Sequence, residues 1–149
     1  LRSEEHRSAV VEGLKDGTID AIVTDHAPHT WDEKDQEFSL APSGFVGLET
    51  SVGAVLTHLY HTGAVDLMTI IRAMSTAPAR LLGVDAGVIA EGKDADLTII
   101  DLDKEWTVDA SSFYSKGKSS PFDEMIFTGK AVATVVDGEF VMKDGVVLK

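Results

Sequence analysis

Residues 19–29 read Ile-Asp-Ala-Ile-Val-Thr-Asp-His-Ala-Pro-His, and this stretch decides the expected fold. Its first part, residues 19–24, is a short and mostly apolar run, typical of a parallel strand that is buried on both faces. Pro28 cannot donate to a strand ladder, so the strand is expected to end in the residues that follow Thr24. A buried parallel strand predicts an α/β fold.

Helical patterns lie on both sides of this predicted strand. Residues 3–15 begin at a potential serine cap and place apolar side chains on one face. Residues 48–61 return to helical spacing, and another helix is expected to begin after Asp66. Residues 30–47 are polar and rich in turn formers, which predicts a long loop of the kind that is often functional. We therefore expect residues 1–83 to be the last part of an α/β domain.

The sequence changes character after residue 83. Short strand-like runs follow one another, at residues 88–89, 97–100, 107–108, 131–136 and 139–142. Asp137-Gly138 and Asp144-Gly145 stand between such runs, and Asp-Gly is a strong hairpin signal because type I′ turns need positive φ. Residues 84–149 are therefore expected to form antiparallel strands of a second, β-rich unit.

The composition restricts the function. The chain has 149 residues, 44% of them hydrophobic and 26% charged, and a formal net charge of −12. This composition is globular, and so negative a charge disfavours nucleic acid or an anionic membrane surface as a partner. No apolar stretch approaches the roughly 20 residues needed to cross a bilayer. The absence of cysteine excludes disulfides and thiolate metal sites and fits a cytoplasmic location.

The length indicates part of a larger protein. A complete (β/α)8 barrel takes about 250 residues. The sequence starts at Leu1 with neither an initiator methionine nor an apolar signal segment. We expect the chain to be a piece of a longer one.

Asp25 is the main catalytic candidate. Ligands bind at the carboxyl ends of strands in parallel sheets, and Asp25 stands at that end of the predicted strand. A carboxylate there can bind a metal through oxygen and relay a proton. The alternative is that Asp25 merely caps the turn, and position alone does not separate the two interpretations. Pro28 stiffens the path between His26 and His29, which lets one imidazole face the strand-end crevice while the other packs.

A glycine-containing loop is the second candidate. Residues 43–47, Ser-Gly-Phe-Val-Gly, precede a predicted helix, so their backbone amides can receive an anion at its start. They lack the spacing of the nucleotide-binding glycine motifs, which excludes a nucleotide phosphate and leaves a substrate carboxylate. Lys116 and Lys118 lie in a polar segment and are interpreted as surface charge.

The motifs together resemble the dihydroorotases, a family of zinc amidohydrolases. Residues 24–29 are similar to the family's Thr-Asp-His-Ala-Pro-His signature, and residues 41–50 to its Ala-Pro-Phe-Gly-Ile-Val-Gly-Leu-Glu-Thr loop. Residues 1–20 resemble the segment before the eighth barrel strand. Residues 87–97 match the Gly-x-Ile-x-x-Gly-x-x-Ala-Asp-Leu pattern of many amidohydrolases, and residues 115–122 are also family-like. The resemblance covers essentially the whole chain.

The resemblance implies a fold and a set of roles. The fold is the carboxyl-terminal part of an amidohydrolase (β/α)8 barrel (residues 1–83) followed by strands of a small β-sandwich (residues 84–149). The aspartate at Asp25 ligates one metal of a binuclear zinc site and acts as general acid and base. The histidine at His29 contacts the substrate, and the residues at Ser43 and Gly44 line its site through backbone groups. Ser43 departs from the phenylalanine usual in the family, so the packing around the substrate ring is expected to differ.

The implied activity is the reversible hydrolysis of L-dihydroorotate to N-carbamoyl-L-aspartate in pyrimidine biosynthesis. Dihydropyrimidinase and allantoinase are alternatives within the superfamily, and His29 favours dihydroorotase because it suits a substrate with a carboxylate. A further alternative is a non-catalytic dihydroorotase-like subunit that scaffolds aspartate transcarbamoylase.

The other metal ligands of the family are expected on the missing amino-terminal part of the enzyme, because one carboxylate cannot hold zinc and stable sites take three or four ligands. Alone, the chain is expected to be inactive, zinc-free and poorly stable. It is also expected to form homo-oligomers, because apolar faces such as those of Leu48, Leu56, Ile70 and Ile71 would be uncovered.

Overall fold

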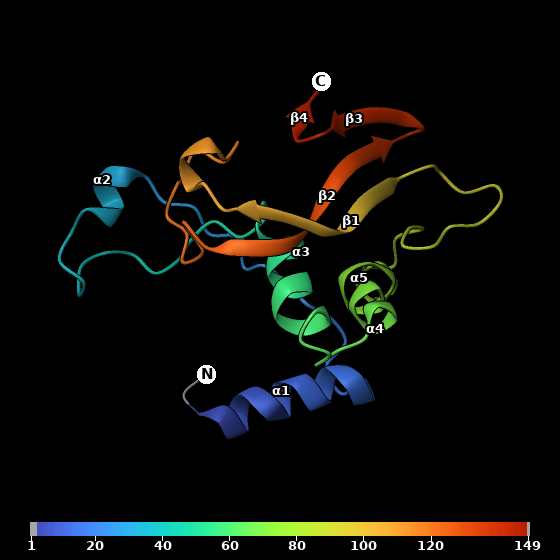
Figure 1. Cartoon of the computed structure of the whole chain (residues 1–149), viewed down its shortest axis with the longest axis horizontal. Helices are drawn as coiled ribbons and strands as arrows, with labels where there is room; N and C mark the ends of the chain where they lie inside the picture. Colours follow the sequence, from blue (N-terminus) through green and yellow to red (C-terminus); the bar gives the residue numbers. More distant parts are fainter. Residues whose placement is uncertain (1–2, 149) are drawn as a thin grey trace.

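The computed structural model describes residues 3–148, in which helices lie beneath a twisted antiparallel sheet (Figure 1). Leu1 and Arg2, which carry part of the family resemblance, lie outside the described residues, as does Lys149. The chain mixes helix and sheet, as the predicted α/β class requires at this coarse level. No helix among the described residues is long and apolar enough to span a membrane.

The first helix and the helix that follows Asp66 begin at the caps that the sequence predicts, and the first helix ends at the predicted glycine. The helix α1 spans Glu4–Asp16, with the Ser3 side chain accepting from the His6 amide and Gly17 closing it at φ 83°. The helix α4 spans Leu67–Ile71, and the Asp66 side chain caps it by accepting from the Thr69 amide. The remaining helical segments are α2 (Trp31–Lys34), α3 (Ser51–Val55), α5 (Ala77–Leu82), the π-helices Leu56–Tyr60 and Arg72–Thr76, and the 3-10 turn Ala110–Ser112.

The sheet is an antiparallel meander in the order β1-β2-β3-β4. Its strands are β1 (Leu97–Thr107), β2 (Ile126–Val136), β3 (Glu139–Lys143) and β4 (Val146–Val147). Asp137 and Gly138 join β2 to β3 with φ values of 50° and 78°, and Asp144 and Gly145 repeat the geometry with 51° and 82°. Both predicted Asp-Gly hairpins are therefore confirmed. The run expected at residues 97–100 and Thr107 of the run expected at residues 107–108 belong to one strand, β1, which bulges in between, whereas Val108 lies just beyond its end.

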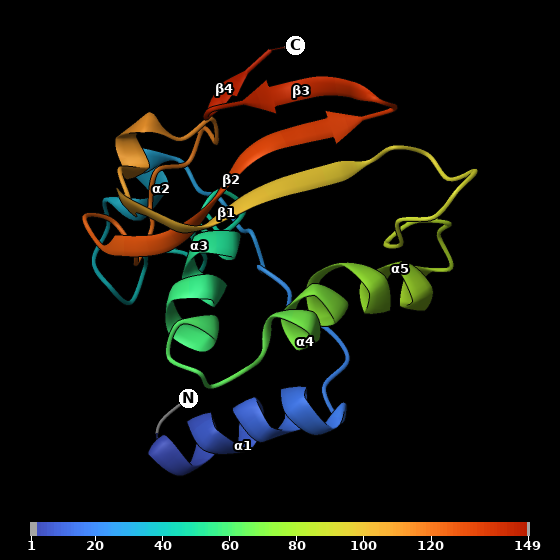
Figure 2. The same ribbon diagram turned by 45° about the vertical axis from the view of Figure 1, so that its right-hand side comes forward.

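A close helix–sheet junction joins the amino-terminal helices to the sheet (Figure 2). A Cβ at Gly53 of α3 would lie 2.7 Å from Cδ2 of Phe127 and 2.8 Å from Cζ2 of Trp106, so only glycine permits this approach. Thr57 Oγ1 accepts from the Thr128 amide at 2.8 Å. The core beneath it consists of Val46, Val108, Ala110, Phe113 and Phe127. A second, smaller core joins α1 to α4 through Val11, Val65 and Ile70.

The prediction of a strand at residues 19–24 is wrong, because these residues form no strand in the structure. The Ile22 amide donates to the carbonyl of Ala73 rather than to a neighbouring strand, and Val23 is 80% exposed. A parallel strand needs a partner strand, and the described residues bring none beside this segment. The strand expected at residues 88–89 is also absent, and Ile89 is 89% exposed.

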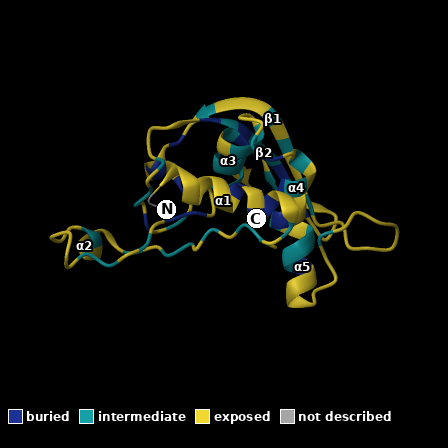
Figure 3. Ribbon diagram, turned by 90° about the horizontal axis from the view of Figure 1, so that it is seen from below, coloured by how far each residue is buried: buried dark blue, intermediate teal, exposed yellow. Residues whose placement is uncertain are grey.

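Two other expectations need correction. The loop predicted over residues 30–47 contains the single-turn helix α2. The apolar helix faces that were expected to be exposed to solvent are partly buried. Leu56 is only 2% exposed because it packs at the helix–sheet junction, and Ile70 is 4% exposed because α1 covers it. Leu48 and Ile71 remain exposed, as do Met68, Leu81 and Leu82, and the exposed outer faces of α1 and α5 are visible in Figure 3.

Candidate active site

Asp25 follows the extended segment at residues 19–24 and has a backbone φ of 45°. The left-handed region is uncommon for a residue with a side chain, although Asp and Asn tolerate it better than most. Such backbone outliers are held only where the surrounding structure determines them, and they cluster at functional sites. The Asp25 side chain is exposed, so the carboxylate is open to a reactant.

Residues 24–29 and 43–48 lie side by side in opposite directions. The amide of Ala27 donates to the carbonyl of Phe45 at 3.0 Å. A Cβ at Gly47 would lie 3.0 Å from the carbonyl oxygen of Thr24, and one at Gly44, where φ is 127°, would lie 2.7 Å from that of Ala27. The two glycines therefore allow the backbones to touch, and the two sequence motifs form one unit.

His26 is the histidine that packs. Its Nδ1 accepts from the Gly47 amide at 3.1 Å and from the Leu48 amide at 3.4 Å. An imidazole nitrogen that accepts carries no proton, so these two contacts fit the tautomer with its proton on Nε2. The amides of Gly47 and Leu48 are occupied by this contact, so these two do not receive an anion as the sequence analysis had allowed.

His29 lies between two acceptors. Its Nε2 is 3.0 Å from the carbonyl oxygen of Ser43, and its Nδ1 is 3.4 Å from Oε2 of Glu33. A carbonyl oxygen accepts, so a proton on Nε2 satisfies the Ser43 carbonyl, and the Nδ1 edge of the ring faces the Glu33 carboxylate. The structure thereby brings together His29, Ser43 and Gly44, three of the four predicted site residues.

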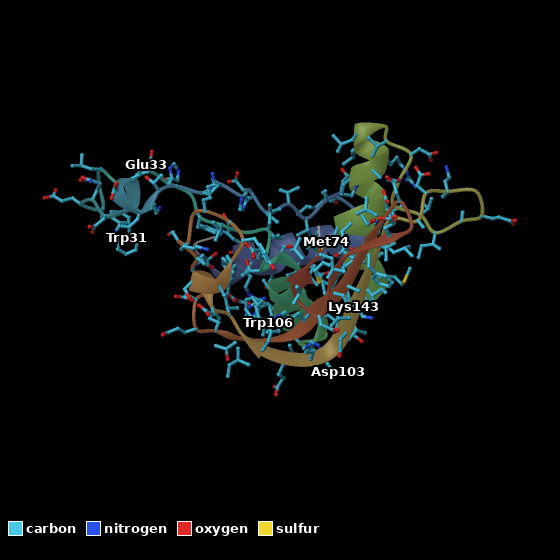
Figure 4. The ribbon with its side chains drawn as sticks, turned by 90° about the horizontal axis from the view of Figure 1, so that it is seen from above. Trp31, Glu33, Met74, Asp103, Trp106 and Lys143 are labelled. Atoms are coloured by element: carbon cyan, nitrogen blue, oxygen red, sulfur yellow. The ribbon has the colours of Figure 1, made fainter. Side chains whose placement is uncertain are left out.

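The single turn α2 holds Glu33 in place. The Thr30 side chain accepts from the Glu33 amide, and the Glu33 carboxylate accepts from the Thr30 amide at 2.9 Å, which makes a reciprocal capping box. The Thr30 amide, the Thr30 hydroxyl and His29 together lower the pKa of Glu33 below its ordinary value, the amide contributing most. Glu33 and Trp31 lie on a loop that projects from the rest of the molecule (Figure 4).

Lys34 closes the base of this loop. Its Nζ donates to the carbonyl of Pro42 at 2.9 Å and to that of Gly44 at 2.9 Å. The carbonyls on both sides of Ser43 are thereby fixed by one ammonium group. Lys34 and Glu33 are not among the site residues predicted from the sequence. Thr30-Trp31-Asp32-Glu33 fits the capping-box pattern and could have located α2, but nothing in the sequence distinguishes Lys34 from other surface lysines.

The described residues do not by themselves form a metal site. Among residues 3–148, no group of three or more His, Asp or Glu side chains is arranged to hold a metal ion. Nδ1 of His26 is occupied by backbone amides, and His29 faces Ser43 and Glu33. Asp25 is left as a single exposed carboxylate, which is fewer than the three or four ligands of a stable zinc site.

Comparisons with known proteins agree with the motifs. The model of the amidohydrolase family matches residues 1–141. Proteins named dihydroorotase from Pelotomaculum thermopropionicum and Bacillus subtilis are 50% and 46% identical over 147 and 149 residues. These alignments cover 99% and 100% of this chain but only 34% and 35% of the relatives, so the chain spans about a third of their length. The resemblance to the dihydroorotases is confirmed.

Solved structures share the arrangement of the backbone. An L-hydantoinase (dihydropyrimidinase) from Arthrobacter aurescens superposes with a TM-score of 0.93 at 39% identity, covering 99% of this chain and 34% of that one. A D-hydantoinase (dihydropyrimidinase) from a Thermus species superposes with a TM-score of 0.89 at 27% identity, covering 99% and 33%.

Proposed function

Because the chain belongs to the amidohydrolase family, we propose that it is the carboxyl-terminal third of a dihydroorotase. The whole protein then hydrolyses L-dihydroorotate reversibly to N-carbamoyl-L-aspartate in pyrimidine biosynthesis. Residues 1–83 supply the end of a barrel and residues 84–149 the strands of a flanking sandwich. The observation that carries the proposal is the unit formed by His29 with the Ser43–Gly44 backbone, next to the exposed Asp25.

Asp25 moves the proton in this reaction. Opening the ring breaks an amide C–N bond, and the leaving ring nitrogen needs a proton. Water supplies both the oxygen of the new C–O bond at the ring carbonyl and this proton. The exposed carboxylate of Asp25 takes the proton from the attacking water and passes it to the nitrogen, and it carries the proton back when the ring closes.

His29 and the neighbouring backbone bind the substrate. Nε2 of His29 lies 3.0 Å from the Ser43 carbonyl, which places the imidazole beside the Ser43–Gly44 backbone, where it contacts the substrate. Ser43 and Gly44 contribute backbone groups, so the change from the usual phenylalanine to Ser43 leaves these groups in place. Lys34 fixes their orientation.

The metal of the family requires ligands from outside this chain. In the whole protein Asp25 would supply one ligand to zinc, which would serve to polarise the substrate carbonyl and to activate water. The remaining ligands come from the rest of the protein, which also covers the exposed Met68, Leu81 and Leu82. The chain alone is then inactive and zinc-free and associates with itself or with the missing part. Aspartate transcarbamoylase is a further candidate partner of the whole enzyme.

Hydantoinase activity is the second candidate, because the Arthrobacter aurescens L-hydantoinase is 39% identical and has the same backbone arrangement. The identities of 43–50% to proteins named dihydroorotase favour the first. Assays of the whole protein with L-dihydroorotate, hydantoin and allantoin separate the candidates. We expect the highest kcat/KM for L-dihydroorotate, and a preference for hydantoin or allantoin would refute the assignment.

A further inference from the structure

We propose that Glu49 is a positioning residue for substrate binding, acting through residues 113–120, which we call the overlying segment. This role rests on the proposed function in one respect, because it takes His29 as the residue that contacts the substrate. The inference assigns to the carboxyl-terminal half of the chain a part in the candidate site, which the motifs place entirely within residues 24–50.

Glu49 fastens the start of the overlying segment. Its Oε2 accepts from the Tyr114 amide at 2.9 Å, and its Oε1 accepts from the Ser115 amide at 3.0 Å. Both carboxylate oxygens are thus used on two consecutive amides, 65 and 66 residues away in the sequence. Hydrogen bonds to a charged acceptor are about twice as strong as neutral ones. Glu49 also follows directly on the loop whose amides bind His26.

The middle of the overlying segment presses on the residues that carry His29. Gly117 is buried, and a Cβ there would lie 2.8 Å from Cβ of Pro28 and 3.0 Å from the carbonyl oxygen of His29. Two further contacts secure the rest of the segment. The Val46 amide donates to the carbonyl of Ser119 at 2.9 Å, and the Lys118 ammonium donates to the carbonyl of Phe113. Lys118 is exposed, as the interpretation as surface charge requires, and its ammonium group also caps the start of the segment at Phe113.

These contacts confine the His29 backbone from two sides. On one side, the Ser43 carbonyl and Glu33 contact the imidazole ring of His29. On the other side, Gly117 packs against Pro28 and the carbonyl group of His29. Release of the overlying segment removes the second side and lets Pro28 and His29 shift. Because His29 binds the substrate without taking part in bond breaking, its displacement weakens binding of the substrate and the transition state alike. Such a loss raises KM and leaves kcat nearly unchanged.

Two substitutions in the whole protein test this from independent directions. Glu49→Gln replaces one accepting oxygen by an NH2 group that faces a backbone N–H, and Gly117→Ala inserts a methyl group against Pro28. We expect each to raise KM about tenfold with kcat within about twofold of wild type. Glu91→Gln, at an exposed position, is the matched control for charge. Gly63→Ala is the control for instability, since a Cβ there meets nothing within 4 Å but is strained at φ 71°.

Amide hydrogen exchange of the same variants supplies a readout that does not depend on the substrate. In Glu49→Gln we expect faster exchange both in the overlying segment and in residues 28–34. If the wild type fails to hydrolyse L-dihydroorotate, the proposed function fails, and hydrogen exchange alone then decides the coupling. Acceleration confined to residues 113–120, or an unchanged KM in both variants of an active enzyme, would overturn the inference. A KM raised equally by Gly63→Ala would do the same.

Discussion

Two apolar stretches of similar composition fold differently in this chain: one forms a strand and the other does not. Residues 131–136, Ala-Val-Ala-Thr-Val-Val, lie in β2 and pair on both edges, whereas residues 19–24, Ile-Asp-Ala-Ile-Val-Thr, form no strand. The first run reaches β3 through the two-residue turn at Asp137-Gly138, so its partner is local. The second matches a parallel strand, whose partner needs a long crossover connection. The β2–β3 hairpin is therefore encoded locally, whereas the candidate active site follows a segment whose partner strand would have to come from a distant part of the protein.

The largest effect is expected where the two regions join. Phe127 is fully buried and makes edge contacts with the rings of His58, Trp106 and Phe122. Phe127→Ala should lower the free energy of unfolding by about 3–5 kcal/mol, the usual range for a buried phenylalanine. Denaturant titration of the whole protein measures the loss.

Phe38 provides the matched control for this substitution because its side chain is 100% exposed. Phe38→Ala should change the free energy of unfolding by no more than about 0.5 kcal/mol. Equal losses in the two variants would show that the helix–sheet junction is not what holds the regions together.

The next largest effect concerns Asp25. Asp25→Asn in the whole protein should lower kcat at least ~10²-fold, the scale for losing a general acid or base. Asparagine tolerates the left-handed backbone, so the fold is retained. Asp144→Asn changes an exposed aspartate with a similar φ of 51° in a hairpin and should leave kcat unchanged. A wild-type kcat in Asp25→Asn would make Asp25 a turn cap.

A smaller effect is expected at Lys34, which holds the loop beside the site. Lys34→Met removes both hydrogen bonds to the Pro42 and Gly44 carbonyls and should raise KM about fivefold, because the Ser43 backbone loses its orientation. Lys34→Arg retains donors and should keep most of the affinity. Lys104→Met, at an exposed position of β1, is the control. Steady-state kinetics that show equal KM values for Lys34→Met and wild type would contradict this role.

The smallest effect is expected in the locally encoded hairpin. Gly138 has a φ of 78° and open space around it, so Gly138→Ala adds only backbone strain. The cost should be about 1 kcal/mol of unfolding free energy. Gly138→Asn should cost less, because Asn enters the left-handed region more easily. Thermal unfolding of both variants checks the order, and a neutral Gly138→Ala would show that the turn does not limit the sheet.

Local signals made much of the fold predictable. The caps at Ser3, Gly17 and Asp66 and the turn at Asp137-Gly138 each act through hydrogen bonds or φ values within a few residues, so the sequence alone reveals them. The prediction for residues 19–24 was wrong because an apolar run of this kind forms a parallel strand only beside a partner strand. The described residues place no partner strand there.

The candidate site was predictable in its parts but not in its connections. The Asp25–His29 motif and the loop at Ser43 and Gly44 are recognisable by sequence, and the contact between His29 and Ser43 brings them together. The anchors Lys34 and Glu49 were not predicted, because they bind backbone carbonyls and amides, which have no sequence signature. The roles of Asp25, His29, Ser43 and Gly44 stay predictions.

In this account the Asp25 site depends on parts of the whole protein that lie outside the 149-residue chain. Comparing the 149-residue chain with the whole protein tests this dependence most directly. Turnover of L-dihydroorotate and bound zinc per chain are measured for both, and light scattering gives the oligomeric state of the chain alone. We predict that the whole protein binds zinc and turns over substrate, whereas the chain alone is oligomeric, inactive and without stoichiometric zinc. A stable monomeric chain that carries stoichiometric zinc and hydrolyses L-dihydroorotate would contradict the account.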